Sequence, residues 1–168
     1  DKNTLELCGF PRFKGISINL IFDMKIAYDA KRLFNNSTGL GNYSRTMINI
    51  LTDYFPENEY HLYTPGIKNK DFGDMYSARK ECRIVNRDSR LLGSIWRSCG
   101  QASQMRRDGI DIYHGLSNEI TSGLTGKGIK SVVTIHDLAF ITFPSMYKPI
   151  DRWIYNRKFL KACRNADV

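Results

Sequence analysis

Short runs of β-forming residues alternate along this chain with longer segments of helical periodicity. The strand-like runs cover residues 25–29, 60–64, 83–86, 111–114 and 131–136, and the helix-like segments cover residues 41–54, 91–107 and a stretch that begins at Asp151. The run at residues 131–136 is β-branched and apolar, which is typical of a fully buried strand. Such alternation predicts an α/β fold: a Rossmann-like parallel sheet with helices on both of its faces.

The segments between these elements carry weaker signals. Residues 31–38 are polar and rich in asparagine, so we expect a loop there, and residues 67–80 are polar and weakly patterned. Met24 begins a segment that reads like the natural start of an α/β protein. Residues 1–23 are therefore expected to be an upstream translated or cloned extension, an extra edge strand at residues 18–22 being the alternative.

The composition fits a single domain and narrows the choice of partners. The 168 residues carry a net charge of +8, concentrated between Arg79 and Arg107 and again between Lys148 and Arg164. Such patches attract phosphates on nucleotides, nucleic acid or anionic lipid, although a solvated helix face explains them equally well. No stretch approaches the roughly 20 apolar residues that cross a bilayer. The four cysteines form no C-x-x-C pair, which indicates free thiols in a reducing compartment and no metal site.

The segment Gly39-Leu-Gly-Asn-Tyr-Ser-Arg45 places two glycines between a predicted strand and a predicted helix. Glycines at such a junction let the backbone approach a ligand closely, and the helix N-terminus offers amide groups to an anion. A dinucleotide-binding loop is a poor match, because Ser44 stands where the third glycine belongs and Gly39 lies ten positions after Asp29. No acidic residue ends the second strand, and the chain has no P-loop motif. These departures argue against NAD binding.

Four parts of the chain, taken in order, resemble retaining glycosyltransferases of family 4, which have the GT-B fold. Residues 24–30 together with 37–45 resemble the opening of these enzymes, and residues 111–115 resemble the strand that ends at the interdomain cleft. Residues 133–140 with Phe143-Pro144 resemble the "HDL…FP" element, and residues 161–168 resemble the helix before the "AD.I…VS" strand. The subgroup resembled is the mannosyltransferase-like one that uses nucleotide sugars. The resemblance implies that residues 24–168 are the N-terminal, acceptor-side half of a GT-B enzyme, with the nucleotide-sugar domain beyond Val168.

The resemblance also implies roles on the donor side. The glycine turn would bind a donor phosphate oxygen or the reacting sugar through four backbone amides, those of Gly39, Leu40, Gly41 and Asn42. The alternative is a plain helix N-terminus with glycines for packing. His136 would contact the donor sugar as a catalytic residue, with Asp137 beside it. The alternatives here are a core histidine bonded to backbone, and an aspartate that only caps its loop.

On the acceptor side, the candidates are His114 and Gly115 at the end of the neighbouring strand, and Tyr43 and Arg45 at the start of the helix. If the sheet is parallel, His114 and His136 face one cleft at the carboxyl ends of the strands. Tyr43 also fits the buried face of its helix, so packing is its default interpretation.

The expected reaction is transfer of a sugar, with mannose as one candidate, from a nucleotide-diphosphate sugar to a glycan or lipid-linked acceptor with retention of configuration. The donor is a substrate, and neither a metal nor a further cofactor is expected. The resemblance implies a cytoplasmic enzyme, and its basic patches would rest on the anionic inner face of the membrane. This chain alone is expected to be inactive.

The alternative is a non-catalytic nucleotide-binding or regulatory module of Rossmann-like fold. Nucleic-acid binding is not expected, because basic and aromatic residues do not interleave on a pair of strands and no nucleic-acid-binding module is recognised.

Overall fold

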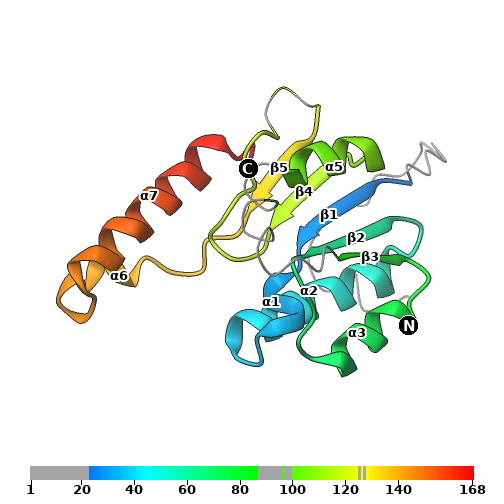
Figure 1. The fold of residues 1–168 in the computed structure, drawn as a ribbon, viewed down its shortest axis with the longest axis horizontal. Helices are drawn as coiled ribbons and strands as arrows, with labels where there is room; N and C mark the ends of the chain where they lie inside the picture. The colour runs from blue at the N-terminus through cyan, green and yellow to red at the C-terminus, as the bar shows by residue number, and fades with distance from the viewer. Residues whose placement is uncertain (1–22, 87–95, 97–99, 125, 127) are drawn as a thin grey trace, which may run out of the picture.

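The structure, a computed structural model, describes residues 23–86, 96, 100–124, 126 and 128–168. Within them, five parallel strands form one sheet in the order β3-β2-β1-β4-β5 (Figure 1). The strands are β1 (Lys25–Asp29), β2 (Glu59–Thr64), β3 (Cys82–Asn86), β4 (Ile112–Gly115) and β5 (Lys130–Val133). Successive strands are added on one side of β1 as far as β3, and then on its other side from β4. The order therefore reverses between β1 and β4, and this switch point is where open α/β sheets bind ligands, beyond the carboxyl ends of the strands.

Helices cover both faces of the sheet. The structure has α1 (Lys31–Asn35), α2 (Gly39–Tyr54), α3 (Lys70–Ser77), α5 (Gln101–Asp108), α6 (Ala139–Thr142), a 3₁₀ turn (Pro144–Met146) and α7 (Pro149–Asn165). On one face, Tyr28 and Leu62 pack with buried residues of α1, α2 and α3. On the other, Ala27 and Tyr63 pack with residues of α5. Neighbouring residues of one strand thus enter opposite cores, as the pleat of a strand requires. The predicted parallel α/β sheet is confirmed.

Two local predictions were wrong. Residues 31–38 were expected to form a loop, but α1 occupies most of that segment, and its Leu33 and Phe34 are fully buried. The run at residues 131–136 was expected to be a fully buried strand. Instead, β5 ends at Val133 and is only partly buried, because it is the last strand of the sheet in the described part of the chain. Of the helix predicted at residues 91–107, the structure describes Trp96 and residues 100–107, and the remainder lies outside the described residues, as do residues 1–22.

The segment after β5 leaves the sheet and later returns to it. Residues 138–166, which we call the arm, carry α6 and α7 away from the body of the molecule, as Figure 1 shows. At the end of α7, the N–H of Val168 donates to the carbonyl of Ser131, and the N–H of Val133 donates to the carbonyl of Val168. This pair of bonds is the parallel-ladder pattern, so Val168 lies alongside β5 as a neighbouring strand residue would.

Candidate functional site

Three side chains that the sequence singled out meet at the switch point of the sheet. Tyr43 comes from the first turns of α2, His114 from the end of β4, and His136 from the segment after β5. The hydroxyl of Thr134 joins two of them: it lies 2.8 Å from Nε2 of His114 and 3.3 Å from the hydroxyl of Tyr43. The rings of Tyr43 and His136 meet edge to face, with centroids 4.7 Å apart. We call these four residues the switch-point cluster.

His136 is held by the loop that follows β4. Its backbone N–H donates to Oδ1 of Asn118 over 2.9 Å, and its Nε2 lies 2.8 Å from the carbonyl oxygen of Leu116. A carbonyl oxygen only accepts, so Nε2 carries the proton and donates it. In the neutral ring, Nδ1 is then the nitrogen with a lone pair. His136 therefore has a fixed orientation and one acceptor nitrogen, which suits a hydroxyl donor on a ligand.

His114 is partly buried between β1 and β5. Burial lowers the pKa of His114 from its ordinary value of 6.5, because the charged form loses hydration, so the imidazole is neutral at pH 7. Its ring also contacts that of Tyr28 on β1, with centroids 5.8 Å apart. Neutral imidazoles and hydroxyl groups both donate and accept hydrogen bonds. His114, Thr134 and Tyr43 thus offer hydrogen-bond donors and acceptors, which suit hydroxyl-bearing ligands such as sugars.

Some backbone amides of the glycine turn already form hydrogen bonds within the chain. A Cβ on Gly41 would lie 1.7 Å from the carbonyl oxygen of Asn36, so only glycine fits there. Side-chain oxygen Oδ1 of Asn36 accepts the N–H of Gly41, and the N–H of Asn42 is bonded to the carbonyl of Thr38. Gly39, by contrast, faces open space. Of the four amides predicted to bind a phosphate, those of Gly39 and Leu40 remain without a hydrogen-bond partner in the described structure.

Arg45, which was expected to contact an acceptor, is buried, and its guanidinium bonds within the chain. Its guanidinium donates to the carbonyls of Leu33 and Asn36 at 2.8 and 2.9 Å and to Oδ1 of Asn42 at 2.6 Å. It also stacks on the ring of Phe72 at 4.2 Å. These contacts satisfy carbonyls that the ends of α1 would otherwise leave unpaired. In the structure, Arg45 therefore holds the turn before α2 in place, and its acceptor contact stays a prediction.

Two further candidates also have structural explanations. Gly115 is buried, and a Cβ there would lie 2.2 Å from the carbonyl oxygen of Glu119, so close backbone packing requires the glycine. This packing explains the glycine, and the acceptor contact of Gly115 stays a prediction. Asp137 is exposed, and its Oδ1 accepts the N–H of Ala139 over 3.1 Å. This bond is the cap that the sequence left open as the alternative for Asp137.

A positively charged cavity lies along the same edge of the sheet, beyond the ends of β2 and β3. Its volume is about 530 Å³, and its lining includes Lys31, Arg32 and Lys68 together with Asn86 at the end of β3. No acidic residue is among the described residues that line it. The cavity suits an anionic group. Asn36 also lines it and bonds to the glycine turn, so the cavity adjoins the start of α2.

The sequence did not reveal Thr134, Asn118 or Asn36. Thr134 looked like one more residue of a buried strand, and only the pairing of β4 with β5 brings it to His114. Asn118 has a φ of 58°, a left-handed conformation that asparagine tolerates well, and its N–H donates to the carbonyl of Thr134. An asparagine shortly after a predicted strand is the one local signal that was available for it.

No family model matches the chain, and no curated protein matches it. In the part of the chain that the structure describes, no group of three or more histidine, cysteine, aspartate or glutamate side chains is arranged to hold a metal ion. None of the described helices is both long enough and apolar enough to cross a membrane. The fold and the switch-point cluster define a Rossmann-like α/β protein with a polar candidate site at its switch point.

Proposed function

We propose that this chain is the acceptor-side half of a retaining glycosyltransferase of GT-B type. The observation that carries the proposal is the switch-point cluster. Tyr43, His114 and His136 lie in three separate segments that resemble this enzyme class. Thr134 joins Tyr43 to His114, and the ring of Tyr43 contacts that of His136, at the place where α/β sheets bind ligands. The order of the four resembling segments along the sequence supports the same assignment.

The chemistry of the site is compatible with sugar transfer. The anomeric carbon loses its bond to the diphosphate oxygen and gains a bond to the acceptor oxygen, and the acceptor's proton leaves with the diphosphate. Nδ1 of His136 accepts a hydrogen bond from a hydroxyl of the reacting sugar, which fixes the sugar for attack. The amides of Gly39 and Leu40, at the N-terminus of α2, donate to a phosphate oxygen and favour the negative charge that develops there. None of these steps uses a metal or a further cofactor.

The acceptor, in this proposal, carries an anionic group such as the phosphate of a lipid-linked glycan. The cavity beside α1 supports this, because its described lining includes Lys31, Arg32 and Lys68. The donor's nucleotide is bound by a second domain of the same protein, and the reaction takes place in the cytoplasm. A chain without that second domain binds the donor weakly and does not turn over.

The experiment is a transfer assay on the protein translated from the complete reading frame, whether that is this chain or a longer one. A panel of radiolabelled nucleotide-diphosphate sugars is offered with phosphate-bearing glycan acceptors, and the anomeric configuration of any product is read by NMR. We expect one donor to be used with retention. Transfer with inversion, or nucleotide binding without transfer from any donor, overturns the proposal, and the second result supports a regulatory module.

His136→Ala tests the site within that assay. We expect transfer to fall on the order of tenfold or more, because an interaction made in the transition state is lost. Asp137→Asn is the matched control at the neighbouring position, because an amide oxygen can keep the bond to the N–H of Ala139. An unchanged rate in His136→Ala, with the fold intact by circular dichroism, removes His136 from the catalytic machinery.

A further inference from the structure

Two cavities adjoin at the edge of the sheet where the strands end. The first is the cavity of about 530 Å³ beyond β2 and β3, and the second, of about 380 Å³, lies between α1 and the start of α3. Asn35, Asn36 and Lys68 line both cavities, so these residues form the ridge between them. Volumes of this size are typical of small-molecule sites. Together the cavities form one candidate site with two halves, which we call the double cavity.

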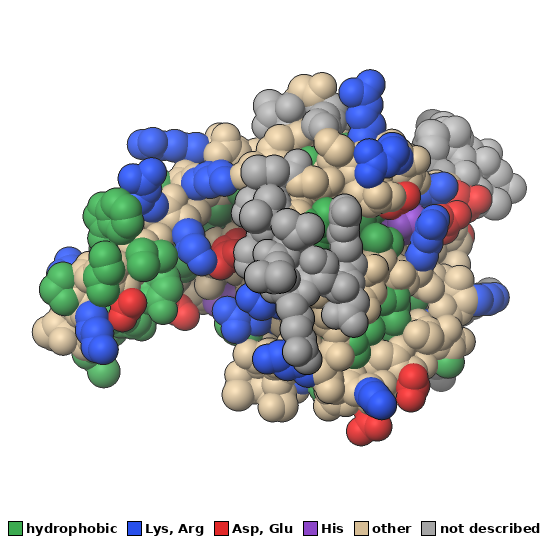
Figure 2. All heavy atoms as spheres, viewed as in Figure 1, with side chains coloured by type: hydrophobic (Ala, Val, Ile, Leu, Met, Phe, Trp, Pro, Cys, Tyr) green, Lys and Arg blue, Asp and Glu red, His purple; other side chains and the backbone are tan. Residues whose placement is uncertain are grey.

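Both halves of the double cavity are positively charged. Lys31 and Arg32 line the first half, Lys70 lines the second, and Lys68 lines both. Acidic residues are missing from the described lining of either half. Figure 2 shows lysine and arginine side chains near the part of the molecule that Figure 1 labels α1. A hollow lined by one sign of charge concentrates anions from solution.

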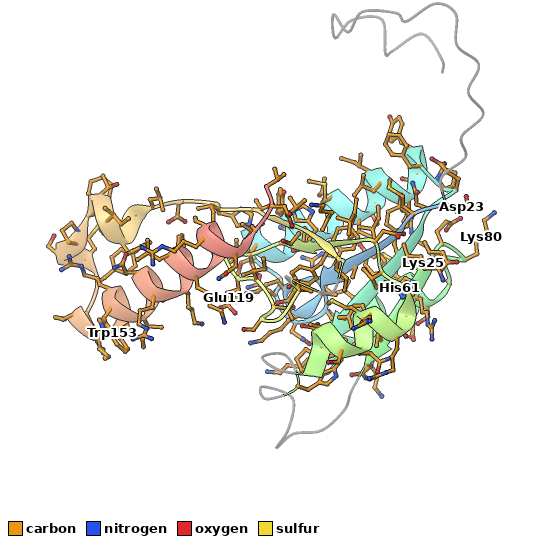
Figure 3. All side chains as sticks on the ribbon, turned by 90° about the horizontal axis from the view of Figure 1, so that it is seen from above. Asp23, Lys25, His61, Lys80, Glu119 and Trp153 are labelled. Atoms are coloured by element: carbon orange, nitrogen blue, oxygen red, sulfur yellow. The ribbon has the colours of Figure 1, made fainter. Side chains whose placement is uncertain are left out.

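The basic side chains of the double cavity differ from some others in the molecule by lacking an acidic partner. Nζ of Lys158, for example, forms an ion pair with Glu119 over 2.8 Å, and Glu119 lies beside α7 in Figure 3. Arg32, Lys68 and Lys70 form no ion pair with any acidic residue that the structure describes. Positive charges held near one another repel, and an anion bound among them replaces that repulsion by attraction.

Hydrogen bonds within the chain fix the walls of the double cavity. Nδ2 of Asn35 donates to the carbonyl of Gly66 over 2.9 Å, and its Oδ1 accepts the N–H of Lys68 over 2.7 Å. These two bonds tie the end of α1 to the loop after β2. Oδ1 of Asn36 accepts the N–H of Thr38 over 2.8 Å. A site that is already formed loses little freedom when a ligand binds, so more of the interaction energy appears as affinity.

The shared lysine indicates how the charges of a ligand are spaced. Two anionic groups, one in each half, can both contact Lys68 only when they are close together, as two phosphates joined by a bridging oxygen are. Nδ2 of Asn36 is a further donor on the same ridge. A single phosphate in the first half would leave Lys70 without a partner, whereas a diphosphate meets the cations of both halves.

We propose that the double cavity binds a diphosphate group, with one phosphate in each half and Lys68 between them. Binding itself is independent of sugar transfer, because it uses no residue of the switch-point cluster. The use of the group rests on the proposed function, under which the acceptor is a diphosphate ester. The acceptor phosphate assigned to the first half is then one of its two phosphates.

Titration calorimetry on the 168-residue chain tests the site with inorganic phosphate and with pyrophosphate. Phosphate should occupy the first half, which has more cations. Arg32→Gln should therefore weaken both ligands about tenfold, because a hydrogen bond between charged groups is lost. Lys70→Gln should weaken pyrophosphate about tenfold and leave phosphate within about twofold. No binding of pyrophosphate, or an equal effect of Lys70→Gln on both ligands, overturns the proposal.

Lys80→Gln is the matched control for the loss of one positive charge. Lys80 is exposed and precedes β3, at the opposite end of that strand from the double cavity, and Figure 3 shows it near Lys25 at the start of β1. Its replacement should leave both affinities unchanged. A loss equal to that in Lys70→Gln means that net charge alone governs binding, which overturns the site.

Two esters distinguish the sources of the diphosphate. Geranyl diphosphate represents a lipid-linked acceptor and uridine diphosphate a nucleotide, and Lys70→Gln should weaken the geranyl ester more. A larger loss for uridine diphosphate overturns the acceptor assignment. A hexose bisphosphate, whose phosphates lie far apart, should bind less tightly than pyrophosphate, and tighter binding overturns the diphosphate.

The same titrations on the protein translated from the complete reading frame separate this proposal from sugar transfer. If Lys70→Gln no longer affects pyrophosphate there, another part of the protein fills the second half, and the diphosphate site is overturned. Pyrophosphate binding that depends on Lys70, without transfer from any donor, leaves the site standing and removes the proposed function. Transfer without such binding does the reverse.

Discussion

The sheet face under α1, α2 and α3 and the arm formed by α6 and α7 are both rich in large apolar residues, yet they use them in opposite ways. Under the three helices, Leu33, Phe34 and Leu62 are fully buried. On the arm, Ile150 and Trp153 are each more than half exposed. The contrast shows that apolar residues at helical spacing predict a surface that needs a partner, and that the partner itself is set by the rest of the fold.

Truncating one leucine in each region gives the largest expected difference. Leu62→Ala removes a fully buried side chain at the centre of β2, and we expect it to lower the free energy of unfolding by about 3 kcal/mol, through lost burial and the cavity left behind. Leu160→Ala on α7 removes a side chain that is 43% exposed, and it should cost less than about 0.5 kcal/mol. Urea unfolding followed by circular dichroism measures both. Equal losses would mean that the arm is packed as tightly as the sheet.

Two arginines sharpen the same contrast. Arg45→Met leaves the carbonyls of Leu33 and Asn36 without their donor, and we expect a loss of about 2 kcal/mol because buried acceptors become unsatisfied. Arg157→Met removes only an exposed contact with the ring of Trp153, so it should cost less than about 1 kcal/mol. Both are read from the midpoint of urea unfolding. A larger loss in Arg157→Met than in Arg45→Met would contradict the structural role of Arg45.

The sequence was sufficient for the elements whose signal is local. The strands at β1 and β2 and the helix that starts at the glycine turn follow from apolar runs and periodicity within each segment. A short helix such as α1 gives no such pattern, and its carbonyls are fastened by Arg45 from the next helix, a tertiary contact. The partial burial of β5 depends on its place at the end of the sheet. Composition alone cannot distinguish such a strand from a central one.

For the candidate site, the sequence predicted which edge of the sheet the histidines share, but not the contacts between the side chains. That His114 and His136 lie at one edge follows from two parallel strands that pair side by side. The hydroxyl that joins His114 to Tyr43 belongs to Thr134, and this contact depends on the register in which Gly115 pairs with Val133. Register is set by the whole sheet, so a single segment does not reveal it. For the same reason, the sequence does not reveal that Arg45 bonds to the carbonyls of Leu33 and Asn36, or that Gly115 packs against the backbone of Glu119.

The smallest expected effect concerns pH, and it compares the switch-point cluster with the rest of the chain. The pKa of His114 is lowered below 6.5 by burial, so the unfolded chain binds a proton that the folded chain resists. The contribution of neutral His114 to the free energy of unfolding is therefore complete above pH 6.5. It is lost as the pH falls from 6.5 to the lower pKa that His114 has in the folded chain. His114→Gln removes this dependence, and every other titratable group is common to the two proteins and cancels in the difference. Urea unfolding from about pH 7.5 to about 5.5 measures it, and parallel profiles for the two proteins would show that His114 takes up its proton without hindrance in the folded state.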